Sequence, residues 1–437
     1  AAAGSGAANT SATDSFTYTL VGGGTATVTL TIDGLDTNDT LEGTVGGDTL
    51  VGGPGYDTVS YATSSAGVTI DLAAGTASGG DAEGDSFSSI EFLTGSSHGD
   101  TLSGTDGTNH FDAGAGSDIV AARGGDDVVT GSIDGANDTY DGGDGVDLLD
   151  YSAVTDAITV DLDAGLASSS SIGTDTLVSF ERLLTGSGND VITGTATTVL
   201  IGSGLGDDTI TGSDGDTTIY AGGGNDTVNA GAGNDIIFGG YGADTLNGDA
   251  GDDLISAGPG LFWDTLDGGD GFDTLDMSDA SVAVKVNLSA GYSLGRGVDT
   301  ISNFERVVTG SGNDVVIASS GNETLEGGAG NDTIIGWAGF DTLEGGSGDD
   351  VLTGGFNADT FVFADGFGND TITDFAATND FERIDLSAVT AIVDFADLAA
   401  NHMVQSGADV VILDGTGATI TLLNVDLSDL GAADFIF

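Results

Sequence analysis

The sequence of 437 residues contains no cysteine, two prolines and only six Lys and Arg residues. The absence of cysteine excludes disulfide bonds, thiolate metal ligands and cysteine nucleophiles. Against the six basic residues stand 70 acidic ones, and the resulting net charge of −64 argues against nucleic-acid and anionic-membrane partners. No apolar run is long enough to predict a membrane-spanning helix.

Catalytic signatures are also scarce. The three histidines, His98, His110 and His402, stand far apart and no HExxH occurs, so no zinc protease site is predicted. No GxSxG occurs, which removes the lipase nucleophile elbow. Acidic pairs are so numerous that counting alone does not exclude a glycosidase dyad. We expect a protein that is not an enzyme and has no catalytic residues.

Glycine and aspartate dominate what is present. Glycine contributes 77 residues, and with nine Glu in the sequence the other 61 acidic residues are Asp. A solubilising surface would use Glu as freely as Asp. The bias instead selects a short carboxylate next to flexible backbone, which suits tight turns and the ligation of hard cations.

Nine-residue repeats organise the sequence. Residues 309–362 divide into six consecutive nines, such as GGAGNDTII and GGSGDDVLT, and residues 221–256 divide into four. Position six of the repeat is almost always Asp. Position eight is apolar in the following copies: Val59, Leu102, Val120, Val129, Leu149, Ile192, Ile210, Val228, Ile237, Leu246, Ile255, Leu266, Leu275, Val316, Leu325, Ile334, Leu343, Leu352 and Phe361.

A nine-residue unit with one inward apolar position is too short for a helix that buries a face. It fits a glycine-rich turn of six residues followed by a strand of three. Two units would form one coil of an all-β, right-handed parallel β-roll, with strands about 4.8 Å apart and the position-eight side chains inside. The position-six carboxylates would then stack in rows whose repulsion requires cations between them.

The pattern GGxGxDxUx, with U apolar, resembles the nonapeptide of RTX, or haemolysin-type calcium-binding, proteins. The resemblance implies ten to twenty Ca²⁺ ions held between successive turns by the Asp carboxylates and turn carbonyls. The oxygen count agrees, because one six-residue turn does not supply the six to eight ligands of calcium. The position-six Asp residues implied as ligands are Asp57, Asp118, Asp127, Asp147, Asp190, Asp208, Asp226, Asp235, Asp244, Asp253, Asp273, Asp314, Asp332, Asp341, Asp350 and Asp359.

Some turns depart from the pattern. The turns of four further aspartates are altered or lengthened, so we expect their carboxylates to be weaker candidates: Asp48, Asp100, Asp138 and Asp264. Asn109, Thr217 and Glu323 occupy position six where Asp is expected. We expect weak or absent calcium binding there, although Glu323 could ligate with a shifted geometry.

Three similar inserts interrupt the repeats, at about residues 60–94, 150–185 and 276–309. Each contains one alternating segment (GVTIDL, AITVDL or AVKVNL), which predicts a strand followed by a loop and a short return, forming a wider coil or a bulge. Phe-Glu-Arg recurs at residues 180–182, 304–306 and 381–383. We interpret it as an aromatic plug with a local ion pair rather than a catalytic pair.

The two ends differ from the repeats. In residues 1–34 the segments DSFTYTL and TATVTLTI predict a β-hairpin that resembles the last strands of bacterial cadherin-like or immunoglobulin-like modules. Residues 35–362 form the roll with its inserts. Residues 363–437 predict a β cap with a helical turn near residues 394–401. They resemble the C-terminal region of serralysin-type proteases, which implies an uncleaved type I secretion signal ending in DFIF.

Two function classes remain after these observations. The first is a secreted, non-catalytic calcium-binding protein at the cell surface or outside the cell, as a surface-layer, filament, matrix or adhesion component. Its partners would be calcium, the type I secretion apparatus and further copies of itself in a filament or lattice. The second is the calcium-folding portion of a larger secreted enzyme, such as a protease, lipase or alginate epimerase. Repeats and cap make up most of the sequence, which favours the first class.

Overall fold

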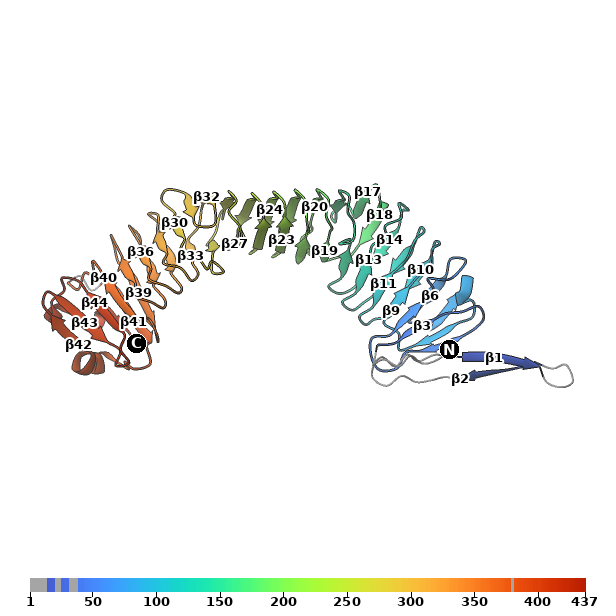
Figure 1. Cartoon of the computed structure of the whole chain (residues 1–437), viewed down its shortest axis with the longest axis horizontal. Coiled ribbons are helices and arrows are strands. Elements are labelled where there is room, and N and C mark those ends of the chain that lie inside the picture. The colour runs from blue at the N-terminus through green and yellow to red at the C-terminus, as the bar shows by residue number, and fades with distance from the viewer. Residues whose placement is uncertain (1–13, 20–24, 31–37, 379–380) are drawn as a thin grey trace. The chain divides into compact units, whose positions relative to one another are not determined.

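The computed structural model describes residues 14–19, 25–30, 38–378 and 381–437, in two compact units, Ala1–Ile210 and Thr211–Phe437. Each unit consists of short strands in successive coils, with a glycine-rich turn before most strands (Figure 1). Strands from alternate turns stack into two parallel sheets, here called sheet I and sheet II. The parallel β-roll predicted from the nine-residue period is confirmed.

In the first unit, sheet I has the order β3-β5-β9-β11-β13-β15-β19-β21, with every neighbouring pair parallel. Its strands are β3 (Thr40–Glu42), β5 (Thr58–Ser60), β9 (Phe92–Thr94), β11 (His110–Asp112), β13 (Val128–Thr130), β15 (Leu148–Asp150), β19 (Arg182–Leu184) and β21 (Leu200–Gly202). Sheet II of this unit contains β6 (Thr69–Asp71), β7 (Thr76–Ser78), β10 (Thr101–Ser103), β12 (Ile119–Ala121), β14 (Thr139–Asp141), β16 (Thr159–Asp161), β17 (Leu166–Ser169), β18 (Gly173–Val178) and β20 (Val191–Thr193). β4 (Thr49–Val51) pairs with β8 (Ser86–Ser88), and a 3₁₀ turn, η1, spans Gly80–Ala82.

The second unit repeats this arrangement. Its sheet I contains β23 (Thr218–Gly223), β25 (Ile236–Tyr241), β27 (Leu254–Ser256), β29 (Thr274–Asp276), β33 (Arg306–Val308), β35 (Thr324–Glu326), β37 (Thr342–Glu344), β39 (Thr360–Ala364), β41 (Arg383–Ala388) and β45 (Phe435–Ile436). Its sheet II contains β24 (Thr227–Ala232), β26 (Thr245–Ala250), β28 (Thr265–Asp267), β30 (Lys285–Asn287), β31 (Tyr292–Leu294), β32 (Val298–Ser302), β34 (Val315–Ile317), β36 (Thr333–Ile335), β38 (Val351–Thr353), β40 (Asn369–Ile372), β42 (Met403–Ser406), β43 (Asp409–Leu413) and β44 (Thr419–Leu422). β22 (Thr209–Ser213) lies where the two units divide.

The core of each unit is the predicted column of position-eight side chains. All of the position-eight residues named above are buried, with exposed fractions of 0 or 1%. In most strands this central residue is buried and its two neighbours are partly exposed, as in β36 and β37. Burial of one such side chain stabilises the fold by about 1.5–3 kcal/mol, and the stack repeats that contribution in every coil.

The inserts differ from the predicted wider coil. In the second insert the strand order in sheet II is β14-β18-β17-β16-β20. β14 and β18 are parallel, β17 is antiparallel to both β18 and β16, and β16 is parallel to β20. The second unit has the same order, β28-β32-β31-β30-β34. The chain therefore skips two strand positions, returns through a meander of three strands, and continues the roll. The prediction of one strand and a loop is wrong, because the second and third strands lack a clear apolar alternation.

The ends of the chain are β-structured as predicted. β1 (Asp14–Thr19) and β2 (Thr25–Leu30) pair antiparallel, while residues 20–24 between them lie outside the described part of the chain. In the cap, β40, β44, β43 and β42 are neighbours, and a short helical segment comprises α1 (Phe395–Asp397) and the π-helical η2 (Leu398–His402). Two 3₁₀ turns, η3 (Leu427–Asp429) and η4 (Ala432–Asp434), precede β45. No helix in the described residues is long and apolar enough to cross a membrane.

Candidate metal centre

The position-six carboxylates are the most consistent feature of the turns. Each of the 16 aspartates predicted as calcium ligands is buried, with an exposed fraction of 0 or 1%. Each precedes a strand directly, so the strand fixes the backbone from which the side chain turns back into its own loop. Deeply buried aspartate without a compensating cation is rare in proteins, which makes the whole set informative.

One oxygen of most of these carboxylates joins two coils. The backbone N–H of Asp314 donates to Asp332 Oδ1 at 2.7 Å, and the N–H of Asp332 donates to Asp350 Oδ1 at 2.8 Å. The same bond recurs along the other side of the roll, where the N–H of Asp341 donates to Asp359 Oδ1 at 3.0 Å. The carboxylates therefore form rows in which most members are fixed by the preceding turn, while Asp190 and Asp314 are fixed by the N–H groups of Ile158 and Val284 in the inserts.

The second oxygen of 14 of these carboxylates has no hydrogen-bond donor. It is buried and lacks a partner in the following residues: Asp57, Asp118, Asp127, Asp147, Asp190, Asp235, Asp244, Asp253, Asp273, Asp314, Asp332, Asp341, Asp350 and Asp359. A buried, unsatisfied oxygen is costly, and a repeated one needs a physical explanation. A cation adjacent to each Oδ2 supplies it.

Glycine at position one leaves space beside this oxygen. A Cβ on Gly327 would lie 2.6 Å from Asp332 Oδ2 and 2.6 Å from the carbonyl oxygen of Gly345 in the next coil. Gly336 is related in the same way to Asp341 and Gly354, at 2.7 and 2.5 Å. Each such space has a carboxylate oxygen and a carbonyl oxygen at its border. These are hard oxygen donors, the ligands that calcium prefers.

The donor set fits calcium better than a transition metal. No group of three or more His, Asp or Glu side chains that could hold a metal exists among the described residues, so a cluster of side-chain ligands is not available there. Calcium accepts backbone carbonyls alongside one or two carboxylates, and it tolerates irregular geometry. Turns such as those of Asp332 and Asp341 offer this mixture, because a carboxylate oxygen and a carbonyl oxygen of the next coil lie close together there.

Two of the aspartates predicted to be weaker candidates already have hydrogen-bond donors on both carboxylate oxygens. Asp100 accepts bonds from the N–H of Ser96 and Val68 and from the Ser96 hydroxyl. Asp138 accepts from the Asp118 N–H and from the hydroxyls of Ser132 and Tyr140.

The other turns that depart from the repeat pattern differ in the hydrogen bonds and burial of their position-six residue. Asn109 uses its oxygen for Thr105 and its amide for the Glu91 carbonyl. Glu323 is buried, and its Oε2 has no partner while Oε1 accepts from Ser319 and Gly321. Thr217 is buried and donates its hydroxyl to the Gly215 carbonyl. Asp48 is half-buried and Asp264 is 7% exposed.

The sequence reasoning missed some members of the rows. Asp370 is 1% exposed, its Oδ1 accepts from the Asp350 N–H at 2.8 Å, and its Oδ2 has no partner. The segment GFGNDTI at residues 366–372 carries the repeat pattern and could have indicated it. Near the inserts, Glu91, Glu181 and Glu305 take the place of Asp in the row, since each accepts the N–H of the preceding position-six Asp at 2.9–3.0 Å.

In two of the three copies of the Phe-Glu-Arg motif, the glutamate belongs to the carboxylate row and the phenylalanine is buried. The expected ion pair between Glu305 and Arg306 is wrong. Phe180 and Phe304 are buried, whereas Phe381 is 69% exposed. Arg306 pairs with Glu326 at 2.7 Å and not with Glu305, whose carboxylate is used by the Asp273 N–H. Glutamate replaces aspartate here because its longer side chain reaches the carboxylate row from a turn that the insert has altered.

Burial raises the pKa of three carboxylates within the rows, Asp118, Asp127 and Asp332, to about 7. Desolvation is the largest cause for these three, and neighbouring carboxylates add repulsion. The pKa of Asp370 rises to about 8 for the same reason. Each raised value says that the metal-free fold disfavours the charged form, which is the form that binds calcium.

A pH dependence follows for the metal-free chain. An Asp pKa near 3.9 in the unfolded chain and near 7 in the fold means that the fold retains protons which the unfolded chain releases. The metal-free fold should be most stable below about pH 4 and lose stability as the pH rises to about 7. Circular dichroism in chelator should show more β-structure at pH 4 than at pH 7.5. Equal spectra at both pH values would contradict this prediction.

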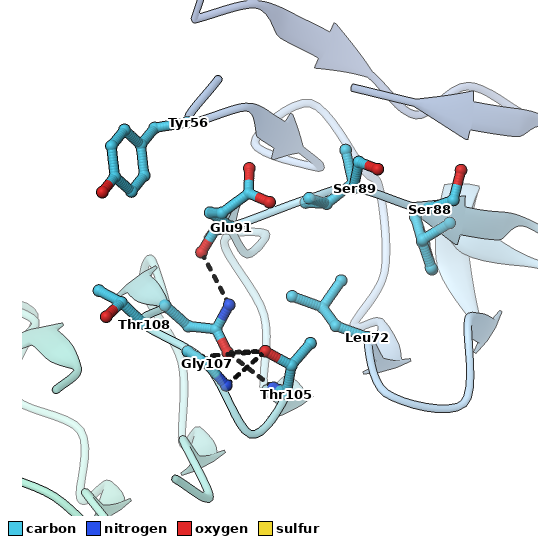
Figure 2. Close-up of a pocket in the computed structure, with 11 residues that line it drawn as sticks. Tyr56, Leu72, Ser88, Ser89, Glu91, Thr105, Gly107 and Thr108 are labelled. Carbon is cyan, nitrogen blue, oxygen red and sulfur yellow. Dashed lines mark hydrogen bonds between the residues drawn. The ribbon is translucent and has the colours of Figure 1, made fainter. Parts of the chain in front are cut away.

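A surface pocket of about 390 Å³ lies beside the first insert, with one carboxylate among its lining residues (Figure 2). The carboxylate among its lining residues, Glu91, accepts the Asp57 N–H through Oε2, and its carbonyl accepts from the Asn109 amide. Burial raises the pKa of Glu91. The pocket offers no second acid to act with it, so its geometry does not favour a glycosidase dyad.

Stacked parallel coils with buried, cation-demanding carboxylates at each turn define a calcium-binding β-roll. Comparison with known families agrees: the model for the RTX calcium-binding nonapeptide repeat matches residues 31–59, 94–129, 180–196, 203–237, 230–261, 308–343, 327–361 and 338–372. The chain therefore contains RTX calcium-binding repeats. The matches cover repeats alone and include no catalytic family.

Two solved structures are similar to parts of the chain. The extracellular lipase LipA of Serratia marcescens is 22% identical over 54% of this chain and 40% of its own, with a TM-score of 0.22. The AlgE6R3 subunit of the mannuronan C5-epimerase of Azotobacter vinelandii is 30% identical over 28% of this chain and 77% of its own, with a TM-score of 0.24. The chain thus spans less than half the length of the lipase. Among curated proteins, no sequence relative matches.

Proposed function

We propose that this protein is a secreted, non-catalytic calcium-binding β-roll that serves as an extracellular structural component, such as a surface-layer, filament, matrix or adhesion protein. The observation that carries the proposal is the set of buried Asp Oδ2 atoms without a donor, repeated over both units. A site that recurs at every coil stabilises the body of the protein, whereas a catalytic site occurs once.

We assign calcium to the turns that contain the 16 position-six aspartates named above, with Asp370 added to the set. Repulsion within the rows, and a net charge of −64, oppose the fold in the absence of cations. In the cytoplasm, where free calcium is low, the chain would remain unfolded and pass through a type I secretion apparatus. Outside the cell, millimolar calcium would fold it.

The C-terminal residues would serve both stages. Phe435 is 6% exposed, and β45 pairs in parallel with β41 in the folded cap. The Phe435 ring lies 5.8 Å from that of Phe395. In the unfolded chain this acidic and apolar ending would be accessible as the secretion signal, and folding would then bury it.

Self-assembly is the part of this proposal that a simple experiment tests. Within the described residues, β1 and β2 pair only with each other, so both outer edges of this hairpin are available for strand addition. A contact between unlike ends that does not close into a ring propagates as a filament or lattice. Deletion of residues 1–32 should convert large assemblies into monomers in light scattering at millimolar calcium. Monomers from both chains would overturn self-assembly and favour the calcium-folding portion of a larger secreted enzyme.

A further inference from the structure

We infer that buried hydroxyl groups close one carboxylate row at each of the three inserts, so that the last Asp of that row holds a hydroxyl where ordinary row members such as Asp127 would hold calcium. This inference rests on the proposed calcium binding. The three carboxylates are Asp85, Asp175 and Asp299, each at most 3% exposed. Like other row members, they accept the N–H of the preceding position-six Asp through Oδ1.

The difference lies at the second oxygen. The Tyr61 hydroxyl donates to Asp85 Oδ2 at 2.6 Å, and the Tyr151 hydroxyl donates to Asp175 Oδ2 at the same distance. Both tyrosines are fully buried. These oxygens therefore have a donor, whereas Oδ2 of ordinary row members such as Asp127 has none.

The third insert reaches the same result with different residues. Met277 follows β29 at the place where Tyr151 follows β15, and it has no hydroxyl. Instead Ser293, in the middle strand β31, donates to Asp299 Oδ2. Ser293 pairs with Val286 as Ala167 pairs with Val160, so a serine stands where the second insert has alanine. The second insert thus has Tyr151 and Ala167 where the third has Met277 and Ser293. Each pair supplies one hydroxyl donor, from the tyrosine in the second insert and from the serine in the third.

The position of these residues explains the need for a donor. Beyond Asp175 the next strand in the sheet is β17, and beyond Asp299 it is β31, both antiparallel to the row. No regular turn stacks on that side of the carboxylate. A calcium shared by two successive turns would lack the ligands of the second turn, and a hydroxyl needs only one acceptor. The inserts thereby end the calcium-binding segments of the rows that lead to Asp85, Asp175 and Asp299.

The first experiment compares two isosteric substitutions in the full chain. Asp299→Asn should leave the number of bound Ca²⁺ ions, measured by equilibrium dialysis, equal to that of the unchanged chain. Asp332→Asn, at an equally buried place within a row, should lower it by at least one ion. Loss of an ion from Asp299→Asn would overturn the inference. If the unchanged chain bound no calcium, the proposed function itself would fail, and the two failures are thus distinguishable.

The second experiment tests the hydroxyl. Ser293→Ala leaves Asp299 Oδ2 buried without a donor, and we expect the calcium concentration at the folding midpoint to rise roughly two-fold. Adding Met277→Tyr to this variant should restore the midpoint, because it recreates the arrangement of the first two inserts. An unchanged midpoint in Ser293→Ala, or no recovery in the double variant, would overturn the role of the hydroxyl. Circular dichroism during a calcium titration supplies both values.

Discussion

In excess chelator at neutral pH, the full chain is expected to give the circular dichroism spectrum of an unfolded polypeptide, and millimolar calcium should convert it to a β-sheet spectrum. The expected change is nearly complete, because each of the two units contains such rows and most of its coils contribute a carboxylate to them. Sites that do not exist before folding bind metal and fold in one event. Persistent β-structure in chelator would contradict the prediction.

Magnesium provides the control for this experiment. It is as highly charged as calcium, and so it screens the 70 acidic residues similarly, but it demands octahedral geometry and releases its water reluctantly. Millimolar magnesium should restore little of the β-sheet signal. Full recovery in magnesium would mean that general charge neutralisation, rather than ligation in the turns, stabilises the roll.

Much of the roll could be predicted from two columns of the repeat. Position eight predicted the buried stack, and position six predicted the rows of carboxylates, because both properties depend on single residues at a fixed period. The same reasoning missed the last turn of the row, which contains Asp370. Asp370 follows the repeat in its local sequence, but the strand before it contains Phe361-Val362-Phe363, which resembles the start of a different element.

The inserts could not be predicted fully, because their topology depends on a local turn rather than on alternation. In each insert an Asx side chain caps the turn: Ala74, Ala164 and Ala290 donate their N–H to Asp71, Asp161 and Asn287, all at 2.8 Å. A glycine with positive φ follows in each case, at Gly75, Gly165 and Gly291. The motif D/N-L-x-A-G therefore reverses the chain, and it was present in the sequence as a hairpin signal.

A large effect on the calcium dependence of folding is also expected from the substitution of one aspartate in a row. Asp332→Ala should raise the calcium concentration at the folding midpoint several-fold, because it removes a ligand and also leaves the buried Asp314 N–H without its acceptor. A buried donor without a partner costs about 1–3 kcal/mol, and the lost ion adds to this. The neighbouring turns should also bind more weakly, since each calcium would be shared between coils. A calcium titration followed by circular dichroism measures both the midpoint and the steepness.

Thr217→Ala is the matched control, because Thr217 occupies position six, is equally buried, and has no carboxylate. Its backbone N–H, which donates to Asp235 Oδ1, remains in the variant, whereas the hydroxyl that donates to the Gly215 carbonyl is removed. The midpoint of this variant should stay close to that of the unchanged chain. Equal shifts in the two variants would show that the carboxylate at position six is not what binds calcium, and the assignment of the rows would then be wrong.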